Sequence, residues 1–531
     1  MARNHASLNW VLELLPALVE DRRLQVVFSL PTTNTSAWTH GVADAIARAG
    51  GIAIPWSQAI SERFDLAIAA NPLGDLAALR SPLLLLTHGP GFTRAVGLPP
   101  RGEVPIPQLS SSDGRVATTL VLTHPSQAQQ FAPGAYDVFV GGDPCWDELA
   151  AGQSHRPVYR EALAVDHDQR LVVISSTWGG QSLLGAHPEA LEDIVGALPS
   201  DSCRVALVLH PNIWAAHSEW QLRAWLGPVR RAGLRVVPPE HGWRASIVAS
   251  DVVIGDHGSV TFYAAMLGRP VLLGSFGTSE LVPGTTTDLL GKVAPRVDGD
   301  GPLGEQIDEV LPLAPHVRDP IRDAAFAFQG QALPRHRDLL YRLIDLPVPN
   351  RPVAPRLPAV PEARWDEPSA WLVETEICSI DPIRIRVDRF APGLTARRQP
   401  SPRQNHLAVV DGIDAAHLLE SAGVIITSPS RLRTNPISGL RSVAARWPGC
   451  RVVAAPDGPD RWQVFTRDGH RTVASWDSST GLDQVPASVV PSVVYAWSLT
   501  ERWGPTDAPV TIEIEVADRV TALSITVARA D

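Results

Sequence analysis

The sequence has few of the residues that mark several common protein classes. Only 4 of its 531 residues are cysteine, and they form no CxxC pair: Cys145, Cys203, Cys378 and Cys450. This argues against a disulfide framework and against a zinc site, and it fits a reducing cytoplasm. The sequence also has no HExxH motif and no paired Cys-His spacing. We therefore expect no metal and no cofactor.

Long apolar runs and positive charge are also scarce. No uninterrupted apolar stretch reaches the roughly 20 residues that a membrane-spanning helix needs. Leu8 to Leu18 is interrupted by Glu13 and is no signal peptide; it predicts a packed helix, and it is the one candidate for a peripheral membrane contact. The net charge of −10 argues against a nucleic-acid partner. We expect a soluble cytoplasmic protein, or one at the inner face of the cell membrane.

What is present is typical of a folded protein with several domains. Hydrophobic residues make up 44% of the chain and charged residues 19%, and 531 residues are too many for one core. Most basic residues are arginine, and alanine, proline and glycine are abundant. This amino-acid composition suggests a genome rich in G and C, such as an actinobacterial one.

Short apolar strands alternate with helical stretches in two successive units. The first unit has expected strands at 24–28, 66–69, 83–86, 116–122 and 136–140, and the second has strands at 171–175, 204–209, 234–237 and 270–273, with another just before Asp256. Apolar strands separated by helices indicate parallel sheets covered on both faces. We predict an α/β fold of two doubly wound, Rossmann-like domains that face a cleft, with residues 1–141 on the acceptor side and 142–345 on the donor side.

The remainder of the chain divides into a linker and a tail. Residues 346–368 carry many prolines, which predicts a stiff linker between domains. Residues 369–531 again mix strands and helices and end in two long alternating strands, 510–516 and 520–527. We expect a separate α/β or α+β domain there, and no motif in it names a function.

The most informative motif is the turn from Asp256 to Thr261, between an apolar strand and a helix. Unpaired N–H groups in the first turn of a helix and the helix dipole both favour a phosphate group. We therefore predict that Asp256, Gly258, Ser259 and Thr261 form a phosphate-binding turn, in which Asp256 also holds the loop through backbone hydrogen bonds.

Three further motifs follow strands and are predicted to face the same cleft. His88 stands in Thr87 to Gly91, where its near-neutral pKa suits a general base. His210 precedes Pro211 at the end of a strand, and Ser176 and Thr177 offer hydroxyl groups. Each also has a purely structural interpretation: a histidine that caps a turn, a histidine packed under Trp214, or an ordinary strand-to-helix connection.

A fourth motif, Gly141 to Asp147, crosses from the first unit to the second. Gly141 and Gly142 allow a tight turn, and Pro144 and Trp146 restrict the chain after it. A hinge is at least as good an interpretation as a ligand contact. Asp147 is expected to cap the helix that begins near Glu148.

Taken together, these motifs resemble those of the CDP-glycerol glycerophosphotransferase family of teichoic-acid synthesis. The family's H-G-T is similar to His88-Gly89-Pro90, its G-x-P-R-x-D to residues 142–147, its His-Pro to His210-Pro211, and its S-D-x-x-I-x-D-Y-S-S-V to residues 250–260. The resemblance covers residues 24–345. Cys145 stands in place of the family's arginine, His257 and Gly258 replace a tyrosine and a serine, and Arg94 is the candidate substitute for a missing lysine as a phosphate contact.

The resemblance implies a GT-B fold and a function. His88 would be the general base on an acceptor hydroxyl, and His210, Ser259 and Thr261 would bind the pyrophosphate of a CDP-glycerol-like donor. A phospho-polyol unit would pass to the acceptor, expected to be a polyprenyl-linked glycan, and CMP would leave.

Two other functions remain open at this stage. One is a GT-B sugar transferase or a nucleotide-sugar epimerase that uses a UDP-sugar, because the fold and the phosphate turn are shared. The other is a non-catalytic scaffold that binds a nucleotide while its tail recruits a partner.

Overall fold

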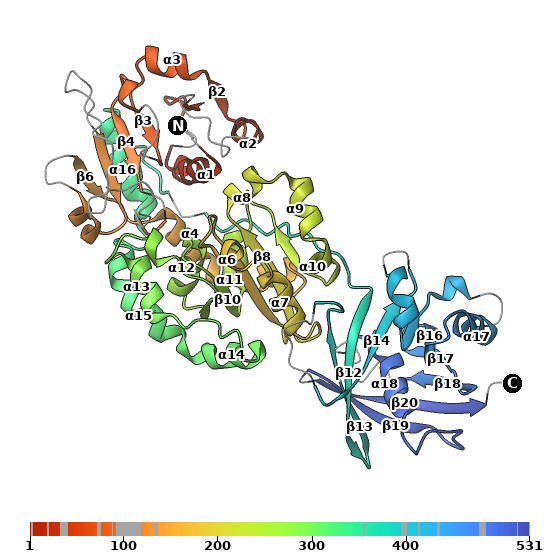
Figure 1. The fold of residues 1–531 in the computed structure, drawn as a ribbon. Coiled ribbons are helices and arrows are strands. Elements are labelled where there is room, and N and C mark those ends of the chain that lie inside the picture. The colour runs from red at the N-terminus through yellow and green to blue at the C-terminus, as the bar shows by residue number, and fades with distance from the viewer. Residues whose placement is uncertain are drawn as a thin grey trace.

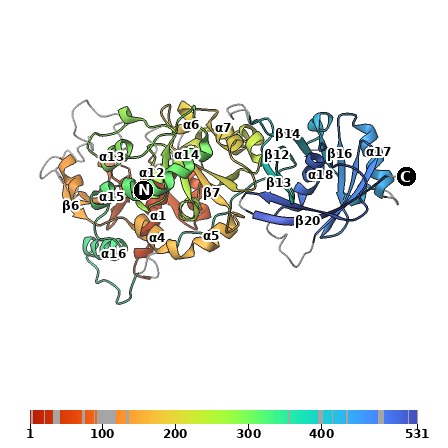
Figure 2. The same ribbon diagram turned by 90° about the horizontal axis from the view of Figure 1, so that it is seen from below.

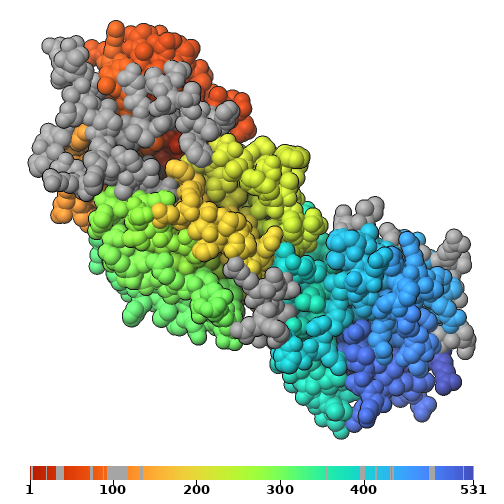
Figure 3. Space-filling view, in the orientation of Figure 1, coloured from red at the N-terminus to blue at the C-terminus, as the bar shows by residue number. Residues whose placement is uncertain are grey.

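The structure is a computed structural model that describes residues 1, 4–18, 21–31, 41–71, 76–87, 89–91, 118–131, 136–353, 356–394, 401–412, 415–432, 436–476, 485–517 and 519–529. These residues form three parts that follow one another along an elongated molecule (Figures 1 and 2). Two α/β lobes come first, in red to orange and in yellow to green. A third body, cyan to blue, lies at the far end (Figure 3).

The first lobe contains a four-stranded parallel sheet whose strands lie in chain order. They are β3 (Ala67–Ala69), β4 (Leu83–Leu86), β5 (Thr118–Leu122) and β6 (Asp137–Val140). All four leucines of β4 are buried, as expected for a strand covered on both faces. A separate parallel pair joins β1 (Val27–Ser29) and β2 (Ile52–Ile54), with α2 (Val42–Arg48) between them in the chain and α3 (Trp56–Ser61) after them.

The N-terminal helix α1 (His5–Leu14) belongs to the core of this lobe. Leu8, Val11 and Leu14 repeat at helical spacing and are each at most 4% exposed. The apolar face that made this segment a candidate for membrane contact is therefore packed inside the protein. No helix among the described residues is long and apolar enough to cross a membrane.

The second lobe contains a five-stranded parallel sheet in the order β11-β10-β7-β8-β9. Its strands are β7 (Arg170–Ser176), β8 (Cys203–Leu209), β9 (Arg235–Val237), β10 (Val252–Gly255) and β11 (Val271–Leu273). Residues of α7 (Ala190–Ala197), α10 (Gly227–Arg231) and α14 (Leu303–Val310) share one hydrophobic cluster with the sheet. A second cluster joins it to α4 (Pro144–Gly152), α5 (Arg156–Ala162), α11 (Trp243–Ala249), α12 (Ser259–Met266), α13 (Thr286–Val293) and α15 (Ala314–Ala325). Short helices α6 (Leu183–Ala186), α8 (Pro211–Ala216) and α9 (Glu219–Trp225) complete the lobe.

The chain then returns to the first lobe before it leaves for the third part. Leu333, Leu339 and Leu340 of α16 (Ala332–Leu343) are buried in the same cluster as Leu8 and Val121. The proline-rich segment after it runs along the second lobe, where Tyr159 donates a hydrogen bond to the Pro358 carbonyl. The domain boundaries remain predictions, but α16 shows that the lobes do not divide the chain into consecutive segments.

The third part is a closed barrel that the sequence did not predict. Its order is β12-β13-β19-β20-β18-β17-β16-β15-β14, with both parallel and antiparallel neighbours. The strands are β12 (Ala370–Ile380), β13 (Ile383–Phe390), β14 (Gln404–Val410), β15 (Val424–Ile426), β16 (Val452–Pro456), β17 (Arg461–Thr466), β18 (His470–Ser475), β19 (Val510–Val516) and β20 (Arg519–Arg529). The largely buried helix α18 (Val490–Trp497) shares their core, and α17 (Pro436–Arg446) packs on β16 and β17.

The predicted α/β class with parallel sheets is confirmed for the first two parts. The observed strand bounds differ from the predicted ones by a few residues. For example, the strand predicted at 24–28 is β1 at Val27–Ser29. The GT-B arrangement of the two lobes remains a prediction. The tail is mixed α and β, as expected, but the closure of its strands depends on pairing between distant segments such as β13 and β19.

Candidate functional site

The candidate site lies where the strand order of the second lobe reverses. From β7 the chain proceeds to β8 on one side, and from β10 it proceeds to β11 on the other, although β7 and β10 are neighbours in the sheet. The loops after these two strands diverge and leave a crevice at their carboxyl ends. In open α/β sheets this is the place where ligands bind. Ser176 and Thr177 follow β7, and the Asp256 turn follows β10, so the topology brings the two motifs together.

Asp256 ties these two loops together. Its Oδ2 accepts hydrogen bonds from the backbone N–H groups of Thr177 and Leu183, both at 2.8 Å, and its Oδ1 accepts one from Gly258 N at 2.9 Å. The side chain is fully buried. Burial raises the pKa of the Asp256 carboxyl, and the amide hydrogen bonds oppose that rise. Asp256 therefore holds the loops in place and does not face the pocket as a ligand-binding group.

The turn held by Asp256 presents the N-terminus of α12. Its N-cap residue is Gly258, which has no side chain to satisfy the N–H groups of the first turn. A Cβ added to Gly258 would lie 3.1 Å from Thr177 Cβ, so only a small residue fits between the loops. Ser259 is the first residue of α12 and is partly exposed. The free N–H groups and the helix dipole suit an anion here.

The first lobe reaches this turn through the loop after β4. Gly89 has a φ of +64°, and a Cβ added to it would lie 3.3 Å from Ser259 Cβ. The two loops therefore meet face to face across the lobes. His88 and Arg94, predicted as general base and phosphate contact, lie outside the described residues.

His210 lies beside the same crevice, at the end of β8. Its Nδ1 accepts a hydrogen bond of 3.1 Å from Asn212 N and so caps α8, while its ring lies 6.4 Å from that of Trp178. When the ring is neutral, this bond places the proton on Nε2. His210 thus caps α8, a structural role other than the packing under Trp214 that was considered for it, and it also lines the pocket described next.

A pocket joins most of the predicted donor-binding residues. Its walls include Ser176, Thr177, His210, Gly258 and Ser259, and α1 of the first lobe closes it with Asn9, Trp10 and Glu13. Its volume is about 80 Å³. Since one water occupies roughly 30 Å³ in the liquid, the pocket in this conformation holds a few waters and not a nucleotide.

Two of the predicted hydroxyl groups face the interior of the protein. Ser176 Oγ donates to the Thr177 carbonyl and accepts from Leu184 N, each at 3.1 Å. Thr261 is fully buried and faces β10, since a Cβ added to Gly255 would lie 2.2 Å from Thr261 Oγ1. The turn therefore offers a ligand the backbone and hydroxyl of Ser259, and not the side chain of Thr261.

Arg244 is a pocket residue that the sequence analysis missed. It comes from α11, and its Nε donates to Cys145 Sγ at 3.2 Å. A guanidinium group therefore lies against Cys145, the residue that replaces the arginine of the resembling motif. Burial lowers the pKa of Arg244 to about 10. Only contacts between distant segments reveal this, because residues 145 and 244 are far apart in the chain.

The charge of Arg244 is shared with two carboxylates. It forms a close ion pair with Glu13 of α1, and its Nε lies 3.7 Å from Glu148 Oε1. Burial raises the pKa of the Glu148 carboxyl to about 7.

In the motif from Gly141 to Asp147, the residue that caps α4 is Asp143 and not the predicted Asp147. Asp143 Oδ1 accepts a hydrogen bond from Trp146 N, whereas the Asp147 carboxylate accepts from Gly330 N and Ala332 N.

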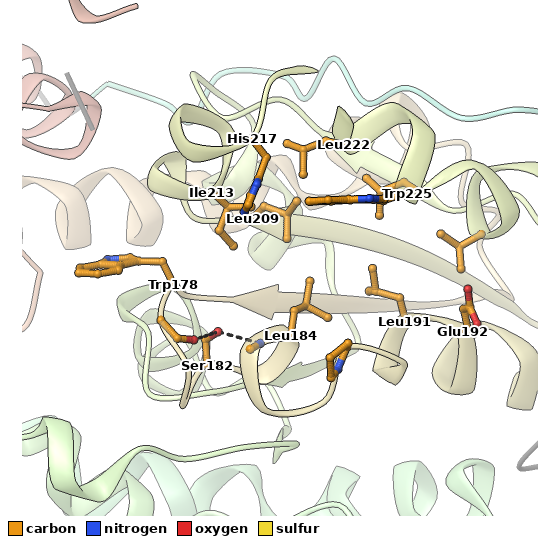
Figure 4. Close-up of a pocket in the computed structure, with 15 residues that line it drawn as sticks. Trp178, Ser182, Leu184, Leu191, Glu192, Leu209, Ile213, His217, Leu222 and Trp225 are labelled. Atoms are coloured by element: carbon orange, nitrogen blue, oxygen red, sulfur yellow. Dashed lines mark hydrogen bonds between the residues drawn. The ribbon is translucent and has the colours of Figure 1, made fainter. Parts of the chain in front are cut away.

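A second, larger pocket of about 440 Å³ opens beside Trp178 (Figure 4). Its walls are mostly apolar, with Leu184 and Leu191 below and Ile213, Leu222 and Trp225 above. Leu209, at the end of β8, lines both pockets. The small pocket at the turn therefore shares a wall with an apolar space large enough for part of an organic ligand.

No family model matches the chain, and no curated protein matches it. Solved structures do. The wall teichoic acid polymerase TagF has 16% sequence identity and a TM-score of 0.40, over 63% of this chain and 93% of its own. WaaG, a glycosyltransferase involved in lipopolysaccharide biosynthesis, has 13% identity and a TM-score of 0.33, over 65% of this chain and 95% of its own.

A third similar structure is that of S. aureus MnaA with UDP, at 11% identity and a TM-score of 0.35, over 66% of this chain and 96% of its own. The resemblance to the teichoic-acid polymerases is thus partial in structure as well as in sequence. Among the described residues, no three His, Cys, Asp or Glu side chains are grouped closely enough to hold a metal ion.

Proposed function

We propose that this protein transfers a phospho-polyol unit from a CDP-activated donor to a hydroxyl acceptor, as a cytoplasmic enzyme at the inner face of the membrane. The observation that carries the proposal is the meeting of Gly89 and Ser259 across the two lobes. Gly89, which follows His88 in the sequence, therefore lies against a helix N-terminus suited to phosphate. The motif pattern of the glycerophosphotransferases, which joins these same two loops, is the second support.

The proposed reaction is an in-line displacement at phosphorus. The acceptor oxygen forms a bond to the phosphorus that carries the polyol, the bond from that phosphorus to the CMP oxygen breaks, and His88 takes the acceptor proton. Such a transfer depends on positioning and on stabilising oxygen charge more than on covalent chemistry. The N–H groups of α12, the Ser259 hydroxyl and His210 would hold the diphosphate.

Arg244 is the proposed source of positive charge. It lines the pocket but is paired with Glu13 of α1. A diphosphate would compete with Glu13 for the guanidinium, and the space it needs exceeds the present 80 Å³. Donor binding therefore requires α1 or the lobes to shift, as in enzymes that close on their substrates.

The first experiment measures which donor the protein binds and cleaves. CDP-glycerol, CDP-ribitol and UDP-sugars are compared by calorimetry and by release of CMP or UDP, with a polyprenyl-linked glycan as acceptor. We expect the CDP-linked donors to bind and release CMP. Turnover of a UDP-sugar alone would replace this proposal with a sugar transferase or an epimerase, and binding without turnover would replace it with a scaffold.

Two variants separate the proposed roles within the site. His88→Ala should lower turnover by roughly 10²-fold or more with donor affinity nearly unchanged, because it removes a general base. Ser259→Ala should weaken donor binding, while Ser442→Ala, on α17 of the barrel, should not. Equal affinity of the Ser259 and Ser442 variants would remove the phosphate assignment.

A further inference from the structure

A third cavity lies between the second lobe and the barrel. Its volume is about 320 Å³. The lobe contributes the amino ends of β8 and β9, with Arg204 and Arg235, and the barrel contributes Trp371 and Arg389. The candidate site lies at the carboxyl ends of the same sheet, so the seven residues of β8 separate the two places by about 20 Å.

Two of the guanidinium groups in this cavity are firmly held. Arg389 is 4% exposed, and its Nε and Nη2 donate to the two oxygens of Asp201 at 2.8 and 2.5 Å. Arg235 is 5% exposed and donates to the carbonyls of Leu163, Gly233 and Ala164. These bonds fix the cavity walls and join the barrel to the lobe.

Arg204 differs from them, because its hydrogen-bonding capacity is not filled. It donates to the Ser200 carbonyl, but its buried Nε has no hydrogen-bond partner among the described residues. A buried N–H without an acceptor is costly, and a ligand oxygen would remove that cost.

The charges around the cavity leave an excess of positive charge. Three guanidinium groups line it against two carboxylates, Asp201 and Glu367. Asp201 is already paired with Arg389, and Glu367 is exposed and accepts from Trp365 Nε1. Burial and, after it, the nearby Arg204 lower the pKa of Arg235 to about 10, against the opposing effect of Glu367 and Asp166. An anion would relieve this repulsion.

The cavity also has aromatic walls and more room than a simple ion needs. Arg235 lies 5.1 Å from the ring centre of Trp365, and Arg389 lies 4.5 Å from that of Trp371. At roughly 30 Å³ each, about ten waters would fill 320 Å³. The occupant therefore combines an anionic group with an organic part that contacts indole rings.

We propose that this cavity binds an organic phosphate of polyol or monosaccharide size, with its phosphate on Arg204 and its carbon skeleton against Trp365 and Trp371. The proposal does not rest on the transferase function, because the cavity lies at the amino ends of the strands and the candidate site lies at their carboxyl ends. Its ligand contacts both the lobe and the barrel, and so gives the third part of the chain a role in recognising phosphorylated compounds.

The test measures binding to the full chain by calorimetry with glycerol 3-phosphate, inorganic phosphate and glycerol. Glycerol 3-phosphate should bind most tightly, inorganic phosphate more weakly, and glycerol not measurably. Arg204→Gln should weaken binding about tenfold or more, because a charge-assisted hydrogen bond is lost. Arg223→Gln, an exposed arginine paired with Glu219 on α9, is the matched control and should not change it.

Further variants keep the result interpretable. Ser259→Ala should leave this binding intact, which separates the cavity from the candidate site. Trp365→Ala should weaken glycerol 3-phosphate several-fold but inorganic phosphate little, and it serves if Arg204→Gln does not fold. Equal binding of the ester and inorganic phosphate would indicate an adventitious ion only, and unchanged affinity in both Arg204→Gln and Trp365→Ala would overturn the proposal.

Discussion

The second lobe meets its two neighbours through junctions whose arginines are paired differently. Toward the first lobe, the guanidinium group of Arg244 lies between two acidic side chains, Glu13 and Glu148, and Arg356 also acts on Glu148. Toward the barrel, three guanidinium groups face Asp201 and Glu367. Both junctions are largely buried and both use arginine, so residue type alone does not distinguish them.

The difference shows how the balance of buried charges sets what a junction accepts. At the first junction an incoming phosphate must displace a carboxylate that already holds the arginine. At the second, three guanidinium groups line the cavity against two carboxylates, so a bound anion would supply the missing negative charge. The three predictions below test this comparison, from the largest expected effect to the smallest.

Removing Asp201 should have the largest effect. Asp201→Ala leaves Arg389 buried without its carboxylate, which should lower the free energy of unfolding by about 3–5 kcal/mol. Trp371, which lies under Arg389, makes urea unfolding followed by tryptophan fluorescence a suitable measurement. Glu219→Ala breaks two exposed pairs, with Arg223 and Arg364, and should change stability by at most about 1 kcal/mol. A similar small loss for both variants would mean that the barrel junction does not depend on its ion pair.

Glu148 should make the first junction sensitive to pH. Its folded pKa is raised from 4.5 to about 7 by burial. The protonated folded form is therefore favoured, and this contribution is complete below pH 4.5 and is lost as pH rises through 7. At about 1.4 kcal/mol per pKa unit, the loss is about 3 kcal/mol.

Glu148→Gln should remove this loss, so its stability should rise relative to the wild type between pH 4.5 and 8. Denaturant unfolding at several pH values measures it, with Glu219→Gln as the exposed control. Parallel pH profiles of the Glu148 variant and the wild type would show that this carboxyl does not titrate as described.

Glu13→Gln should have the smallest effect, and it is the most direct test of competition at the first junction. Loss of the carboxylate leaves Arg244 available to a phosphate, so affinity for CDP-glycerol should rise about fivefold, or about 1 kcal/mol. Calorimetry measures it, and Glu240→Gln, whose carboxylate pairs with Arg48, is the control. Weaker binding by Glu13→Gln would show that Glu13 supports the donor site instead of opposing it.

Much of the site could be predicted from sequence because its parts are short segments at strand ends. The Asp256 turn lies between β10 and α12, as the pattern indicated, and Ser176, His210 and Ser259 share one pocket. Thr261 was a weaker prediction, because a residue in the first turn of α12 can face either the pocket or the sheet, and packing against Gly255 decides which. His88 and Arg94 remain predictions.

Local patterns in the chain were enough to indicate parallel α/β units, the turn that holds a helix N-terminus, and the separate character of the last 160 or so residues, because hydrophobic periodicity and turn chemistry act over short distances. The closure of the barrel, the return of α16 to the first lobe, the contact of Arg244 with Cys145 and the gathering of Arg204, Arg235 and Arg389 were decided only on folding. Each of these contacts joins segments that are far apart in the chain. The charge balance of a buried junction depends on all of those segments together, so it cannot be predicted from any one of them.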